Sequence, residues 1–149
     1  EELGLDRIRP LMTAPRTKGG AITKAASEVG ATVGAKFLVT FTQSGDSARR
    51  ISRLRSPIPI LAITQEEGTY NRLALSWGVE SLVTPMVKHT DEMVLQADKM
   101  LLDGKRANEG ELVMIVAGSP PGIPGSTNAM RVHKVGDAVN GVAAAYRKS

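Results

Sequence analysis

Cysteine is absent from this 149-residue chain, and aromatic residues make up only 3% of it. Without cysteine the chain can form neither disulfides nor thiolate metal sites, which agrees with a reducing, cytoplasmic setting. Two Phe, two Tyr and one Trp leave few side chains that could stack on nucleic-acid bases. The sequence also lacks an apolar run of the roughly 20 residues needed to span a membrane. We therefore expect neither nucleic acid nor a membrane as a partner.

The charge balance is mildly positive and gives no concentrated basic face. Nineteen Lys and Arg against fifteen Asp and Glu leave a formal net charge of +4, and these basic residues are dispersed, whereas nucleic-acid binding needs them clustered. His89 and His133 stand far apart without metal-ligand spacing. We expect both histidines at the surface, and we expect no catalytic residue, metal or other cofactor in this chain.

Most of the chain is predicted to form one domain, since a chain of this length buries about 68–70% of its unfolded surface. Residues 1–15 begin with Glu rather than Met and contain Pro10 and Pro15, which indicates a linker or the remnant of a preceding domain. Residues 16–135 carry the regular pattern of the domain. For residues 136–149 we expect a C-terminal extension that forms a short helix or stays loose.

Apolar runs of strand length alternate with helical stripes along the domain. We expect Ala21, Tyr70 and Ala74 on the buried faces of the first and third helices. The alternation predicts an α/β fold of three layers, α/β/α, around a five-stranded, mostly parallel sheet whose last strand returns antiparallel at one edge. Strands are predicted at residues 36–41, 60–64, 79–83, 112–117 and 129–133, and helices from about residues 18, 48, 65 and 90.

A short polar turn, Thr42–Ser47, joins the first predicted strand to the second predicted helix. A turn of hydroxyls and Gly at a helix start presents free backbone N–H groups, and the helix dipole there favours an anion such as phosphate. Ser44 or Asp46 could instead simply cap the helix. The arginines of this helix are expected to form a face that is exposed to solvent or lies in an interface; they are Arg49, Arg50, Arg53 and Arg55. Of these, Arg49 or Arg50 could help to bind a phosphate.

A second loop, Gly118–Asn128, follows the fourth predicted strand and is rich in Gly and Pro. Ligands of open α/β sheets bind outside the carboxyl ends of the strands. If the first and fourth strands are neighbours, both loops leave the same edge of the sheet and face each other. This convergence favours an anion-binding pocket over a simple helix cap.

Several blocks of the sequence resemble the C-terminal domain of pyruvate kinase. The most telling is Phe-Thr-Gln-Ser-Gly-Asp-Ser-Ala at residues 41–48, and the blocks keep the family's order and spacing from about Pro15 to Val135. The others are residues 26–31, 53–55, 59–64, 111–117 and 125–132.

The resemblance implies a parent enzyme of glycolysis that transfers a phosphoryl group from phosphoenolpyruvate to ADP. That enzyme uses magnesium and usually potassium. Its catalytic groups lie on a β/α barrel that carries a lid domain, and neither the barrel nor the lid is part of this sequence. The C-terminal domain is the regulatory part of the family: it binds a phosphorylated effector, accompanies the barrel domain of its own chain and helps form a homotetramer. By this resemblance the effector phosphate is held by Thr42, Gln43, Ser44, Gly45, Asp46 and Ser47, and the sugar is covered by Gly122, Ile123, Pro124 and Gly125.

The sequence departs from family members that are activated by a sugar bisphosphate. Gln43 stands where such members often carry Lys, and Asp46 stands where they often carry Arg. Residues 89–92 lack the Trp and Arg that bind the second phosphate. Because a carboxylate near a phosphate repels it, we expect a hexose or nucleotide monophosphate rather than a bisphosphate, or no effector in the isolated domain.

Two other functions compete with the regulatory one. The first is a purely structural domain with a vestigial effector site, in which residues 129–133 pair as an edge strand across a two-fold axis. The second is a small hydrolase with Ser44 or Ser47 as nucleophile. It lacks a Gly-x-Ser-x-Gly elbow, and neither histidine has an obvious triad partner. We therefore predict a regulatory domain.

Overall fold

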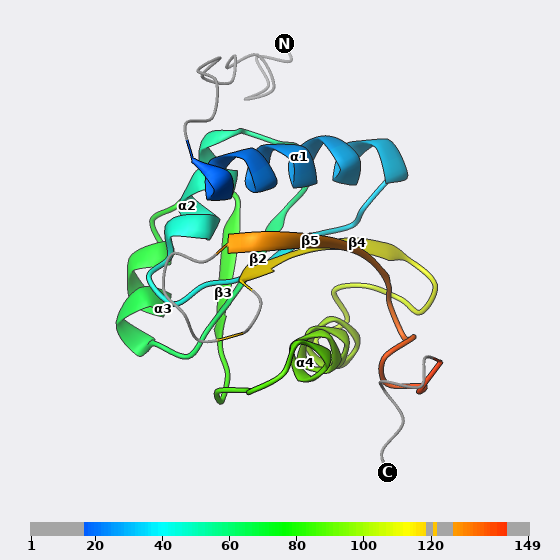
Figure 1. Ribbon diagram of the computed structural model, residues 1–149. Coiled ribbons are helices and arrows are strands. Elements are labelled where there is room, and N and C mark those ends of the chain that lie inside the picture. Colours follow the sequence, from blue (N-terminus) through cyan, green and yellow to red (C-terminus); the bar gives the residue numbers. More distant parts are fainter. Residues whose placement is uncertain (1–16, 119–120, 122–126, 143–149) are drawn as a thin grey trace.

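Five strands form one sheet in the order β3-β2-β1-β4-β5 (Figure 1). The computed structural model describes residues 17–118, 121 and 127–142. Parallel pairing joins β1 to β2 and β4, and β2 to β3, whereas β5 runs antiparallel to β4 at the sheet edge. The predicted fold class is therefore confirmed, including the adjacency of the first and fourth strands. The strands are β1 (Leu38–Phe41), β2 (Ile60–Thr64), β3 (Val79–Val83), β4 (Leu112–Gly118) and β5 (Thr127–Lys134).

Helices cover both faces of the sheet, so the domain has three layers (Figure 1). Successive strand residues point to opposite faces. Leu38 accordingly packs with Ala26 of α1, whereas Val39 packs with Leu101 of α4. On the first face α2 and α3 add Ala48 and Leu73 above Ala62. The helices are α1 (Lys18–Val33), α2 (Asp46–Arg53), α3 (Glu67–Leu73) and α4 (Thr90–Asp103).

The ends of α1 follow from local sequence chemistry. Thr17 is its N-cap, and the Thr17 hydroxyl accepts a hydrogen bond from the Gly20 N–H at 3.0 Å. Gly34 ends the helix in the left-handed conformation with φ of 72°. The start agrees with the helix predicted from about residue 18. No helix within the described residues has the length and apolar character of a membrane span.

Three residues predicted to be buried on helix faces are exposed. Ala21 of α1 is exposed, Tyr70 of α3 is 40% exposed, and Ala74 is exposed and lies beyond the end of α3. The sequence pattern predicts a third helix that continues to Gly78, whereas α3 ends at Leu73. Its buried residues are Thr69 and Leu73.

His133 on β5 is buried, so its predicted place at the surface is wrong. Its side chain is 2% exposed, and its Nε2 lies 2.6 Å from Oδ1 of Asp98 on α4, whose side chain is 0% exposed. The Asp98 carboxylate also accepts backbone N–H groups from Gly136 at 3.2 Å, Ala138 at 2.9 Å and Val139 at 3.2 Å. The spacing of one sequence could not show that this histidine faces a carboxylate on the helix below it.

These contacts determine the ionisation of Asp98. Burial by itself raises the pKa of the carboxyl, but the hydrogen bond from His133, the backbone N–H groups and the charge of His133 outweigh it and hold the pKa below its usual value. The charged side chain thereby holds the turn at residues 136–139 against α4. Ala138 packs in the same core cluster. His89, in contrast, is exposed as predicted.

Candidate functional site

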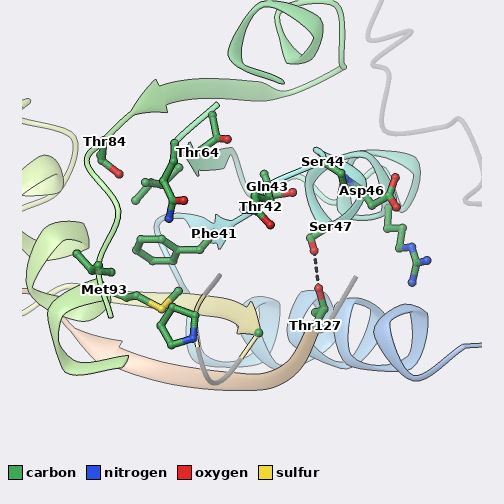
Figure 2. Close-up of a pocket in the computed structure, with 16 residues that line it drawn as sticks. Phe41, Thr42, Gln43, Ser44, Asp46, Ser47, Thr64, Thr84, Met93 and Thr127 are labelled. Carbon is green, nitrogen blue, oxygen red and sulfur yellow. Dashed lines mark hydrogen bonds between the residues drawn. The ribbon is translucent and has the colours of Figure 1, made fainter. Parts of the chain in front are cut away.

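A pocket of about 80 Å³ lies at the carboxyl edge of the sheet (Figure 2). Its lining comes from the ends of β1, β2 and β4, the segment after β3, and the starts of α2, α4 and β5. One water molecule needs a cavity volume of about 10–15 Å³. The pocket is therefore large enough for several water molecules or for part of a small ligand.

The two loops singled out in the sequence meet at this pocket. Residues of the Thr42–Ser47 turn line it together with Gly118 and Pro121 from the loop after β4. They meet because β1 and β4 are parallel neighbours, with Thr40 paired to Val116, so both strands end at the same edge. The four loop residues assigned by resemblance lie outside the described residues; they are Gly122, Ile123, Pro124 and Gly125.

The Thr42–Ser47 turn has a fixed conformation. The Thr42 hydroxyl accepts the Gly45 N–H at 2.9 Å, and the Thr69 hydroxyl of α3 donates to the Gln43 carbonyl at 2.7 Å. Gly45 is buried and has φ of 89°, which a side chain would strain. These bonds tie the turn to α3 and point the start of α2 at the pocket.

Neither Ser44 nor Asp46 is the N-cap of α2. The N-cap is Gly45, which offers no side chain, and Asp46 is the first helical residue. The Ser44 hydroxyl accepts only the Asp46 N–H, at a long 3.3 Å. Among the described residues, no acceptor takes the backbone N–H groups of Ser47 and Ala48. The helix therefore begins with open donors, as an anion site requires.

The two arginines of α2 that could assist a phosphate differ in their surroundings. Arg49 donates to Oδ1 of Asp46 at 2.7 Å and to the Ser44 carbonyl at 3.1 Å, so its charge and that of Asp46 offset each other. Arg50 lines the pocket, and its Nη1 donates to the Thr17 hydroxyl at 2.9 Å. Among the described lining residues Arg50 is the cation and Asp46 the carboxylate, and Arg49 offsets the charge of Asp46 from outside the lining.

The rest of the pocket combines apolar and uncharged polar groups. Figure 2 shows Phe41 and Met93 at one end, and Ser47 hydrogen-bonded to Thr127 at the other. The Ser47–Thr127 oxygens are 2.5 Å apart. The amide oxygens of Gln43 and Gln65, both lining residues, have no partner among the described residues. Such groups suit a polar ligand with hydroxyls.

Several lining residues were missed by the sequence reasoning. A signal for them existed, because Thr64 and Gln65 stand at the end of the second strand and Thr84 follows the third. The carboxyl-end rule applies to these strands as it does to the first and fourth. Met93 had no such signal, since only the packing of α4 brings it to the same edge, whereas Thr127 belongs to the Gly118–Asn128 loop that is predicted to face the turn.

Comparison with known proteins gives one family. Residues 20–133 match the family model described as "Pyruvate kinase, alpha/beta domain". A pyruvate kinase of Mycobacterium tuberculosis is 48% identical over 128 residues, which are 86% of this chain and 27% of the relative. A pyruvate kinase of Corynebacterium glutamicum is 42% identical over 131 residues, which are 88% of this chain and 28% of the relative. The chain thus spans about a quarter of the length of these curated relatives.

A solved structure agrees with the sequence comparison. The structure of Cryptosporidium parvum pyruvate kinase in complex with ADP aligns with a TM-score of 0.74 and 27% sequence identity. The alignment covers 83% of this chain and 25% of that one. The three-layer fold described above therefore has a counterpart within a larger protein.

Proposed function

The chain belongs to the pyruvate kinase family, as its C-terminal alpha/beta domain, and from this premise we propose that it is a regulatory domain that binds a phosphorylated effector. One observation carries the proposal: the start of α2 opens with free N–H groups onto a pocket lined by Arg50, while the carboxylate of Asp46 is paired with Arg49. A helix N-terminus and a guanidinium both favour a phosphate. Ser44 and Ser47 add hydroxyls at the same place.

The proposed effector carries one phosphate. Arg50 is the one cation among the described lining residues, and the segment 89–92, which would have to supply cations for a second phosphate, does not line the pocket. The sugar or nucleoside of this effector would extend past Gln43 and Gln65, whose amide oxygens have no partner among the described residues. We therefore propose a hexose monophosphate or a nucleoside monophosphate.

The activity of the whole protein is also a proposal. In the parent enzyme the phosphoryl group would pass from phosphoenolpyruvate to ADP on a barrel domain outside this chain. Effector binding here would shift that activity only if the effector distinguishes two states of the assembled, homotetrameric enzyme. Among the described residues, no three His, Asp or Glu side chains gather where they could hold a metal ion.

Removal of the two turn hydroxyls tests the proposed function. We expect the double substitution Ser44→Ala/Ser47→Ala to weaken binding of glucose 6-phosphate, or of a nucleoside 5′-monophosphate, by at least about tenfold, because hydrogen bonds to a charged group are strong. Isothermal titration calorimetry measures the effect. Thr32→Ala, which removes an exposed hydroxyl of α1 outside the pocket, serves as the control. Equal affinities in the double variant and the wild type would remove these hydroxyls from the site.

Neutralising Asp46 gives a prediction of opposite sign. Asp46→Asn removes a carboxylate from the pocket and releases Arg49 from its 2.7 Å ion pair. We expect phosphate-ester binding to tighten by about two- to fivefold, and the gain to shrink at high salt because exposed charges are screened. Titrations at two salt concentrations measure it, with Asp91→Asn in the first turn of α4 as the matched control. Unchanged affinity would mean that the ligand lies far from Asp46.

A structural role is the second candidate, and the exposed residues of β5 favour it. Met130 is 39% exposed and Val132 is 44% exposed on this edge strand. Edge strands readily pair across a two-fold axis. Thermal melts separate the two functions: a melting temperature unmoved by millimolar sugar phosphates, together with dimers in sedimentation, would favour the structural role.

A further inference from the structure

Arg50 is the cation among the described lining residues, and its side chain takes part in no ion pair with the described carboxylates. Among the described residues, its one hydrogen bond goes to the uncharged Thr17 hydroxyl. Arg49, its neighbour in sequence, is engaged by Asp46 and by the Ser44 carbonyl. An anion in the pocket would therefore meet the charge of Arg50 rather than that of Arg49.

The guanidinium of Arg50 is held against the start of α1. Its Nη1 donates to the Thr17 hydroxyl at 2.9 Å, and this oxygen also accepts the Gly20 N–H at 3.0 Å, as the N-cap bond of the helix. Gly19 leaves the necessary space, since a Cβ at this position would lie 2.7 Å from the same Nη1. The site thus joins the starts of two helices, α1 and α2, through one side chain.

One bond to Thr17 leaves most of the Arg50 donors available. A guanidinium presents five N–H groups in a planar fork, which suits two oxygens of one phosphate. The hydrogen bond to Thr17 already restricts the Arg50 side chain, so this side chain loses less conformational entropy when a ligand binds to its other N–H groups. Thr17 can therefore prepare Arg50 for a ligand without releasing it.

We propose that Arg50 binds the phosphate group of a phosphate monoester in this pocket, and that Thr17 positions the guanidinium so that ligand binding stabilises the first turn of α1. The inference rests on the proposed function and names the charged residue and the regulatory connection of that site. Thr17 and α1 are the first part of the chain that the structure describes, so the connection reaches the N-terminal end of the described domain. Coupling between the ligand and this turn is reciprocal.

The binding role is tested with two variants that change the net charge equally. We expect Arg50→Gln to weaken binding of glucose 6-phosphate, a nucleoside 5′-monophosphate or inorganic phosphate by about 10- to 100-fold, the scale of a charge-assisted hydrogen bond. Arg53→Gln removes an exposed arginine one turn later on the same helix, outside the pocket, and should change the affinity less than about threefold. Arg50→Lys, which keeps the charge and loses the fork, should fall between them.

The positioning role needs a second measurement. Hydrogen exchange of the Gly20 amide should slow several-fold when wild-type protein is saturated with ligand, because the ligand, Arg50 and Thr17 then form one chain of contacts. At saturating ligand this protection should be lost in Arg50→Gln, which leaves the N-cap bond of Thr17 in place. Thr17→Val should weaken ligand binding, and Thr17→Ser should restore it.

The outcomes separate this inference from the proposed function. Equal affinities for Arg50→Gln and Arg53→Gln, with wild-type binding intact, would overturn the role of Arg50 and leave the regulatory site standing. Ligand binding without any change at Gly20 would overturn the role of Thr17. Failure of the wild-type protein to bind any of the three probes would refute the proposed function itself.

Discussion

We expect Asp98→Ala to lower the free energy of unfolding by about 3–5 kcal/mol, the usual result of breaking a buried ion pair. The substitution leaves His133 and three backbone N–H groups without their acceptor inside the fold. It also leaves a space beside the core cluster that contains Ala138. Urea unfolding followed by circular dichroism measures the change.

The matched control for this prediction is Asp103→Ala. Asp103 ends the same helix and is exposed, and a surface substitution of this kind changes stability by less than about 0.5 kcal/mol. If Asp98→Ala were as mild as this control, the buried network would contribute no net stability. Phosphate binding should not depend on either residue, since neither lines the pocket.

Asp98 also makes the free energy of unfolding depend on pH, and acid should lower it. Its pKa is held below the ordinary value in the folded protein, after the opposing effect of burial, by the hydrogen bond from His133, the backbone N–H groups and the charge of His133. Its stabilisation is therefore fully present above the unfolded pKa of about 3.9 and is lost as pH falls through the folded pKa. Below about pH 4 the stability advantage of the wild type over Asp98→Asn should shrink. An advantage that grows in acid would contradict this sign.

Gly45→Ala should damage both stability and ligand binding. Gly45 has φ of 89°, and an added Cβ would lie 2.7 Å from Nη1 of Arg49 and 3.3 Å from Cδ2 of Leu73. Backbone strain and displaced packing together should cost about 2–4 kcal/mol. The turn that presents Ser44 and Ser47 would shift with it, so we expect glucose 6-phosphate affinity to fall at least about tenfold.

Gly34→Ala is the control that separates the backbone strain of a positive φ from the effects of a side chain in the Thr42–Ser47 turn. Gly34 also has a positive φ, of 72°, but an added Cβ would meet nothing within 4 Å. This variant should lose only the strain energy, about 1–2 kcal/mol, and should bind ligand like the wild type. Chemical unfolding and calorimetry on both variants make the comparison. Normal ligand binding in Gly45→Ala would show that the turn conformation does not matter for the site.

The main elements of the fold were predictable because their signals are local. The run Ile60–Thr64 is continuous and apolar, and every residue of β2 is buried. Thr17 and Gly34 carry their own capping chemistry, so the ends of α1 follow from a few residues. The third helix was misjudged because its real length depends on where its packing against the sheet stops, which no local signal gives.

The choice between Arg49 and Arg50 needed the folded structure. Neighbouring residues on a helix point about 100° apart, so only one of the two can face a given pocket. The rotation of α2 is fixed by Ala48 and Ile51, which are fully buried against the sheet. This rotation pairs Arg49 with Asp46 and leaves Arg50 at the pocket.

By itself the sequence determined the α/β architecture, the polar turn at the start of α2 and the membership of the family, since periodicity and contiguous motifs are properties of neighbouring residues. Tertiary structure alone decided that Thr17 bonds Arg50, that Thr127 is the loop residue bonded to Ser47, and that His133 meets Asp98. These pairs are separated by 33, 80 and 35 positions. Contacts between residues so far apart in the sequence form only after the strands have taken their order and the helices their rotation. They cannot be predicted from local sequence, because no pattern of neighbouring residues specifies which distant residue will be in contact.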